Sequence, residues 1–198
     1  MLDQVGRNET SSLHVHTAIL TRSSKFLQNA MKPEWRTDAT KPIDMSDVNL
    51  TIFEGYCAWL YTGNVLYHGK YQRYLYLACL YVVGERLMDT AFQDVIGAAF
   101  ISRQKHINNR FPGNTMIQTN YASTFENSPA RRLMVDFWVF GAKSIWIGLT
   151  DLIENICPDL VNDLVRGLIA KRGAPDGFVQ RLWLANPESY RVGSKETK

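Results

Sequence analysis

The fold of this chain is decided by the stretch Ile52-Phe53-Glu54-Gly55-Tyr56-Cys57-Ala58-Trp59-Leu60-Tyr61-Thr62-Gly63. Apolar side chains recur in it at helical spacing: Ile52, Tyr56, Trp59 and Leu60 on one stripe, with Phe53 and Cys57 beside them. Asn49 is placed as an N-cap, and Gly63 ends the pattern because glycine adopts a left-handed conformation without steric cost. The pattern therefore predicts a helix packed on several sides, at the centre of a core.

The sequence pattern of this stretch is Phe53-x-x-Tyr56-x-x-Trp59-Leu60-Tyr61-Thr62-Gly63. This pattern resembles the central helix of the BTB/POZ domain. Two other segments, Leu13 to Phe26 and Leu77 to Leu87, are similar to family motifs and occur in the family's order. The resemblance covers about the first half of the chain. It implies an α+β fold, in which a helical cluster is flanked by a short sheet, followed here by a mostly helical C-terminal extension. It also makes His16 a structural residue at a strand-to-helix corner.

Alternating apolar residues predict short strands of that sheet at residues 13–16 and 42–45, and the resemblance implies a third at 64–67. Two short helices are expected over 17–22 and 23–31. A first strand is expected before Val5, at half length at best, since only four residues precede that position.

The resemblance and the local composition divide the chain into four segments. We expect a BTB/POZ domain over residues 1–101, a loop or hinge over 102–124, a helical extension over 125–190 and a flexible tail over 191–198. The segment 102–124 is rich in Asn, Thr, Gln and Gly, which favours a loop.

Two helices are predicted in the extension. Ser128 is placed as an N-cap with Pro129 at the first helical position, and the segment around it is similar to one that follows BTB domains in many fungal proteins. Pro158 begins a second helix with one apolar face, which Gly173 ends.

Composition places the chain among ordinary globular proteins. Of its 198 residues 45% are hydrophobic and 21% charged, and the net charge of +3 is too mild to indicate nucleic-acid binding. Asp136 and Lys143 interrupt the most apolar region, so we expect no membrane span. The three cysteines are far apart in sequence and indicate reduced thiols in an intracellular protein, cytoplasmic or nuclear.

No residue pattern indicates catalysis or ligand binding. His14-x-His16 lacks the further ligands that a metal site needs, and Cys57 and Cys79 stand among apolar neighbours typical of inert thiols. Arg131 and Arg132 are interpreted as a solvated helix face. We therefore expect no catalytic residue, no cofactor and no bound metal, and the chain is interpreted as a non-enzyme.

The function implied by the resemblance is protein–protein interaction, through self-association or adaptor binding. An alternative is a substrate adaptor of a cullin-based ubiquitin ligase. A small enzyme with no recognisable motif is the alternative from another class, and a structural remnant of an incomplete gene model is a third.

Four residues are candidates for partner binding: Met31, Glu34, Trp35 and Tyr61. Cullin-binding family members tend to carry a hydrophobic-x-Glu pattern after the second short helix, but here Glu34 stands three residues after Met31 rather than two. Pro33 restricts the backbone between Met31 and Glu34, so the chain cannot easily compensate for the extra residue. Weak or absent cullin binding is therefore expected. Trp35 is the candidate exposed anchor. Tyr61 matches a position that in the family often lies at the cullin-binding face. An interpretation of equal weight is that Tyr61 has no binding role and is a half-buried ring with a solvated hydroxyl.

Overall fold

The structure is a computed structural model that describes residues 12–36, 38, 41–66, 73–106, 111–143, 149–151, 157–171 and 187. All the regular secondary structure of these residues is helical. The elements are, in order, α1 (Thr17–Leu20), α2 (Lys25–Ala30), the short 3₁₀ helix η1 (Pro33–Trp35), α3 (Leu50–Thr62), α4 (Arg73–Arg86), α5 (Thr90–His106), α6 (Asn114–Ser123), α7 (Pro129–Gly141), α8 (Leu149–Asp151) and α9 (Pro158–Lys171).

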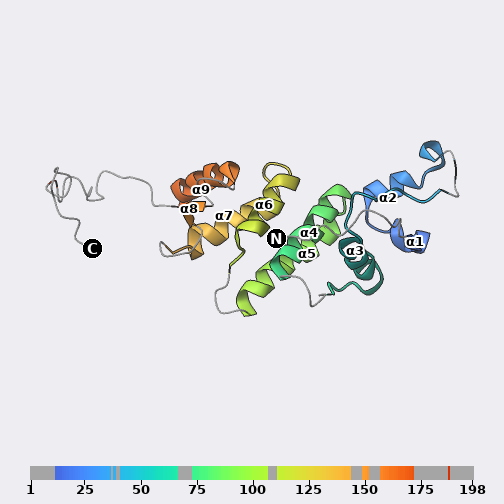
Figure 1. The fold of residues 1–198 in the computed structure, drawn as a ribbon, viewed down its shortest axis with the longest axis horizontal. Helices are drawn as coiled ribbons and strands as arrows, with labels where there is room; N and C mark the ends of the chain where they lie inside the picture. The colour runs from blue at the N-terminus through green and yellow to red at the C-terminus, as the bar shows by residue number, and fades with distance from the viewer. Residues whose placement is uncertain are drawn as a thin grey trace.

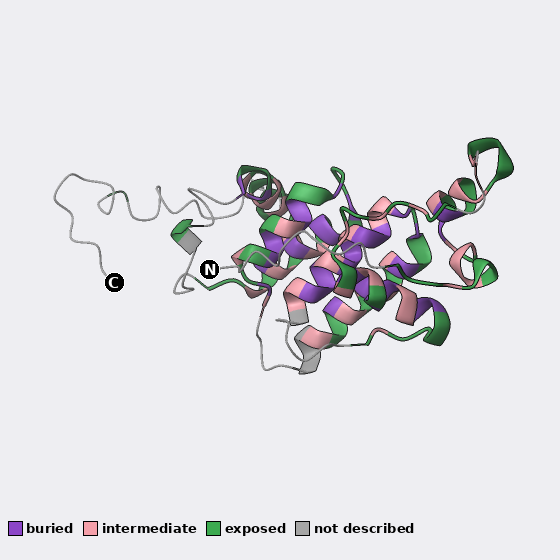
Figure 2. Cartoon of the chain, turned by 45° about the vertical axis from the view of Figure 1, so that its right-hand side comes forward, coloured by how far each residue is buried: buried purple, intermediate pink, exposed green. Residues whose placement is uncertain are grey.

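Helix α4 lies at the centre of the arrangement and packs against α3, α5 and α6 (Figure 1). On one side α1 packs against α3, and on the other α6 packs against α7 and α7 against α9. Helices α1 to α3 thus occupy one end of the molecule and α7 to α9 the other. Buried residues gather where the central helices meet, and the outer helix faces are exposed (Figure 2).

Helix α3 confirms the prediction made from its sequence. The side chain of Asn49 accepts a hydrogen bond from the Ile52 amide at 3.3 Å, and Gly63 ends the helix at a φ of 71°. Trp59 is buried, with its ring centroid 4.8 Å from that of Phe92 on α5. The predicted apolar stripe therefore faces the core.

Helices α3 and α4 approach each other closely at Gly55. A Cβ atom at that position would lie 2.2 Å from the hydroxyl oxygen of Tyr76 and 3.1 Å from a methyl carbon of Leu80. No real side chain tolerates such a contact, so the separation of the two helices depends on glycine here.

The short sheet is not confirmed, because the described part of the chain contains no strand. Residues 13–16, 42–45 and 64–66 have no regular secondary structure, and Tyr67 and the first predicted strand lie outside the described residues. A strand exists only where a neighbouring segment completes its ladder of hydrogen bonds, which alternation within one segment cannot establish. The two predicted short helices are present as α1 and α2.

The loop predicted over residues 102–124 is wrong for much of its length. Helix α5 continues to His106, and residues 114–123 form α6. Helix α6 packs against α4, and its residues Met116, Ile117 and Tyr121 are buried. The polar composition hid this face, and tertiary packing outweighs the modest helix propensity of Asn and Thr.

Both helices predicted in the extension are present. α7 begins at Pro129 and α9 at Pro158, as expected. Ser128 precedes α7, but its side chain makes no capping bond; its Oγ instead lies 3.3 Å from the Tyr81 hydroxyl on α4. Gly173 and the predicted tail 191–198 lie outside the described residues.

Candidate protein-interaction site

The segment after α2 presents the most exposed of the candidate residues. Ser24 holds α2 in place, since its Oγ accepts from the Leu27 amide at 3.0 Å and donates to the Leu87 carbonyl at 2.6 Å. The chain then leaves the body of the molecule and forms η1 (Figure 1). Trp35 ends this turn with 77% of its surface exposed.

Arg36 closes the turn that carries Trp35. One guanidinium nitrogen lies 3.1 Å from the sulfur of Met31, and the other donates to the carbonyl of Lys41. Met31 is consequently half-buried, whereas Glu34 and Trp35 are exposed. Two of the three candidates on this segment are therefore available to a partner without any rearrangement.

Tyr61 lies in the last turn of α3, and its contacts are with His16 rather than with the Trp35 turn. Its hydroxyl accepts from the His16 amide at 3.1 Å and lies 2.7 Å from Nδ1 of the His16 ring. His16 is the residue before α1, which has no side-chain cap of its own. The hydroxyl of Tyr61 thus supports the start of α1 instead of being left to solvent, while its ring is half exposed.

A buried carboxylate that no sequence pattern indicated holds this part of the fold together. Asp89 precedes α5, and its Oδ1 accepts from the Phe92 amide at 3.1 Å, as an N-cap does. Its Oδ2 accepts from the Ser23 hydroxyl at 2.5 Å and from the Tyr56 hydroxyl at 2.9 Å. Burial, followed by the neighbouring charge of Asp89, raises the pKa of Tyr56, so its phenol stays protonated and donates.

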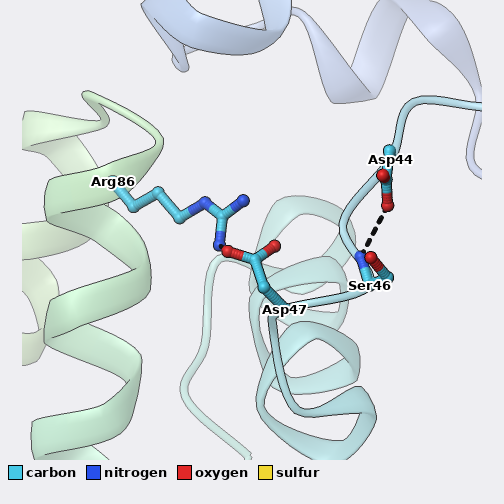
Figure 3. Close-up of polar contacts among 4 residues, drawn as sticks. All are labelled: Asp44, Ser46, Asp47 and Arg86. Carbon is cyan, nitrogen blue, oxygen red and sulfur yellow. Dashed lines mark hydrogen bonds and ion pairs between the residues drawn. The ribbon is translucent and has the colours of Figure 1, made fainter.

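A surface ion pair fastens the segment that leads into α3. Asp47 pairs with Arg86 at the end of α4, and the hydrogen bond from Arg86 lowers the pKa of Asp47 (Figure 3). The pKa of Asp44 is lowered chiefly by the Ser46 amide, which donates to it at 2.9 Å. Because both folded-state pKa values are depressed, this support is present near neutral pH and is lost as the pH falls through them. Both carboxylates are exposed, so solvent screening keeps the contribution small.

Arg131 corrects the prediction of a solvated face. It is buried, donates to the Tyr121 carbonyl at 2.7 Å and to the Thr124 hydroxyl at 3.1 Å, and lies 4.7 Å from the centroid of the Tyr121 ring. Arg132 is exposed, as expected, and donates to the Asn127 carbonyl at 2.7 Å. Arg131 therefore closes the turn between α6 and α7 and is not available as a surface contact.

The three cysteines are free thiols. Burial raises the pKa of Cys57 to about 11 and also raises the pKa of Cys79 and of Cys157. Little of the reactive thiolate exists near neutral pH at such values. Among the described residues, no group of His, Cys, Asp and Glu side chains is arranged to hold a metal ion. None of the helices described here is long and apolar enough to cross a membrane.

Comparison with known protein families matches residues 4–93 to the BTB/POZ domain. The chain therefore carries a BTB/POZ domain, which is a protein–protein interaction module, and this domain includes Met31, Glu34, Trp35 and Tyr61. Neither the curated proteins nor the solved structures provide a match to the chain.

Proposed function

We propose that this chain acts as a protein–protein interaction module, through self-association or as an adaptor for another protein, and that Trp35 is an anchor of the interaction. The observation that carries the proposal is the exposed indole on a closed turn within the BTB/POZ domain. Large aromatic side chains dominate the energy of many interfaces, especially when the free protein already holds them in place.

The buried polar residues favour this function over the alternative of a small enzyme. In the described part of the chain they all make structural hydrogen bonds, at helix starts, in turns or within a helix: Ser24, Asp89, Asn120, Thr124, Ser128 and Arg131. A catalytic site needs several polar groups that converge on a shared space and are left for a substrate. Here these six side chains are occupied in holding helices together, and among their buried polar atoms only Oδ1 of Asn120 is without a hydrogen-bond partner.

Replacing Trp35 by Ala is expected to weaken self-association of the full chain at least about thirtyfold, because a hot-spot aromatic contributes about 2 kcal/mol or more. Sedimentation equilibrium over a dilution series measures this. Phe125→Ala is the matched control, since Phe125 is 76% exposed and belongs to the turn before α7, outside the domain. Equal association constants for the two variants would count against Trp35 as the anchor.

A cullin is proposed as a weak partner at most. Glu34 follows Met31 by three residues, and the sulfur of Met31 is engaged by Arg36. The family's contact pattern therefore does not transfer directly to this turn.

In a pull-down with the host's cullin, little retention is expected for wild type and for a Met31→Ala, Tyr61→Ala double variant alike. Both side chains are at least partly exposed, and thermal melts of the variants check that the fold survives. Tight binding by wild type that the double variant loses would show that the offset does not matter and that the adaptor role in ubiquitin ligation is correct.

A further inference from the structure

One side of helix α9 is buried against the rest of the molecule, and another side carries exposed apolar side chains. On the buried side, a Cβ atom at Gly167 would lie 2.8 Å from a methyl carbon of Val135, so α7 covers this side directly. Three residues at the spacing i, i+3, i+4 on another side are about half exposed: Val165 (51%), Leu168 (52%) and Ile169 (56%).

The last turn of α7 adds an aromatic ring at this end of the helix pair. Phe140 is 71% exposed, and the ammonium nitrogen of Lys171, the last residue of α9, lies 5.6 Å from the centroid of its ring. We call Phe140, Val165, Leu168 and Ile169 the α7/α9 patch. Contiguous exposed apolar groups rimmed by polar ones mark interaction sites more often than chance exposure does.

The charges beside the α7/α9 patch are mostly positive. Within α9, the charged residues after Asp163 are Arg166 and Lys171, both exposed. Near Phe140, Lys143 is exposed two residues after the end of α7, and Asp136, one turn before Phe140, is the acidic exception. Two further carboxylates belong to α9, but Asp159 lies in its first turn and Asp163 accepts from the Tyr121 hydroxyl at 3.0 Å. The charges next to the patch are therefore three cations and the carboxylate of Asp136, which favours a ligand with negative charge beside an apolar face.

We propose that the α7/α9 patch docks an amphipathic helical segment of a partner protein whose polar flank is acidic. Apolar side chains of that segment pack on Leu168 and Ile169, and its carboxylates pair with Arg166, Lys171 and Lys143. The inference rests on the proposed function of the chain as an interaction module. It assigns a second surface, however, which lies outside the BTB/POZ domain at residues 4–93.

The test measures binding of two synthetic helical peptides to the full chain by fluorescence anisotropy. Both peptides carry Leu along one face; the other face carries Glu in one peptide and Lys in the other. The Glu peptide is expected to bind, and to bind less tightly as salt rises. Leu168→Ser with Ile169→Ser is expected to weaken binding at least about tenfold, the equivalent of 1.4 kcal/mol. Arg166→Glu with Lys171→Glu is expected to reverse the preference toward the Lys peptide. Phe125→Ser is the control and is expected to change nothing, since Phe125 precedes α7 at the opposite end of that helix, about 20 Å away.

Other results would overturn the proposal. Failure of the Glu peptide to bind, or equal binding of both peptides, rules out an acidic partner. A concentration-dependent dimer that Leu168→Ser with Ile169→Ser abolishes assigns the patch to a second copy of the chain. Preferential binding of phosphatidylserine vesicles by the patch assigns it to a lipid surface. Trp35→Ala is expected to leave peptide binding intact, so failure at the Trp35 turn and failure at this patch are separable.

Discussion

Asp89→Ala is expected to lower the free energy of unfolding by about 3–5 kcal/mol, because it removes a helix cap and leaves buried donors without an acceptor. The Phe92 amide and the hydroxyls of Ser23 and Tyr56 all donate to this one carboxylate. Urea unfolding followed by circular dichroism measures the change.

Two matched variants separate the roles of the Asp89 carboxylate. Asp94→Ala removes an exposed carboxylate from the same helix, α5, and is expected to change stability by no more than about 0.5 kcal/mol. Asp89→Asn keeps an acceptor for the Phe92 amide but turns an amide toward the two hydroxyls, so an intermediate loss is expected. If Asp89→Ala behaved like Asp94→Ala, the carboxylate would have no structural importance.

Trp59→Ala is expected to cost about 3–5 kcal/mol through lost transfer free energy and the cavity left behind. The indole is 5% exposed, lies 4.8 Å from the Phe92 ring and 5.9 Å from the Tyr56 ring between centroids, and has Arg22 over its face. A thermal melt of the variant beside wild type measures the loss.

The natural control for Trp59→Ala is the same substitution at Trp35. That indole is 77% exposed, and its loss is expected to change stability by no more than about 0.5 kcal/mol. Similar melting temperatures for the two variants would show that α3 does not supply the core.

Local patterns in the sequence were enough to predict the helices that carry their own signals. Helix α3 has a cap, an apolar stripe and a terminal glycine within fifteen residues, and all three are found in the structure. The starts of α7 and α9 were predicted in the same way, from a proline at the first helical position. Helix α6 lacks such signals, because Gly113 at its N-cap provides no capping side chain and one of its four buried residues is the polar Asn120. It packs against α4.

Features that depend on distant contacts could not be predicted. Asp89 reaches Tyr56, 33 residues earlier, and Ser23, 66 residues earlier, and no spacing within one sequence indicates such meetings. Arg131 was interpreted as solvated because arginine is rarely buried, and its acceptors are backbone carbonyls and a hydroxyl that carry no charge signal. The exposed Trp35 was predictable, because a tryptophan beside proline and charged residues has few apolar neighbours in sequence.

The close approach at Gly55 has a consequence for how this sequence can evolve. A substitution to Ala would place a methyl group 2.2 Å from the Tyr76 hydroxyl oxygen and 3.2 Å from the ring carbon that bears it. Removing the hydroxyl by a change to Phe would leave contacts of 3.2 Å to that ring carbon and 3.1 Å to a methyl carbon of Leu80, which shifts of a few tenths of an ångström relieve. The two positions are therefore expected to covary among descendants of this chain, and single changes at Gly55 are expected to be purged unless the change at Tyr76 comes first.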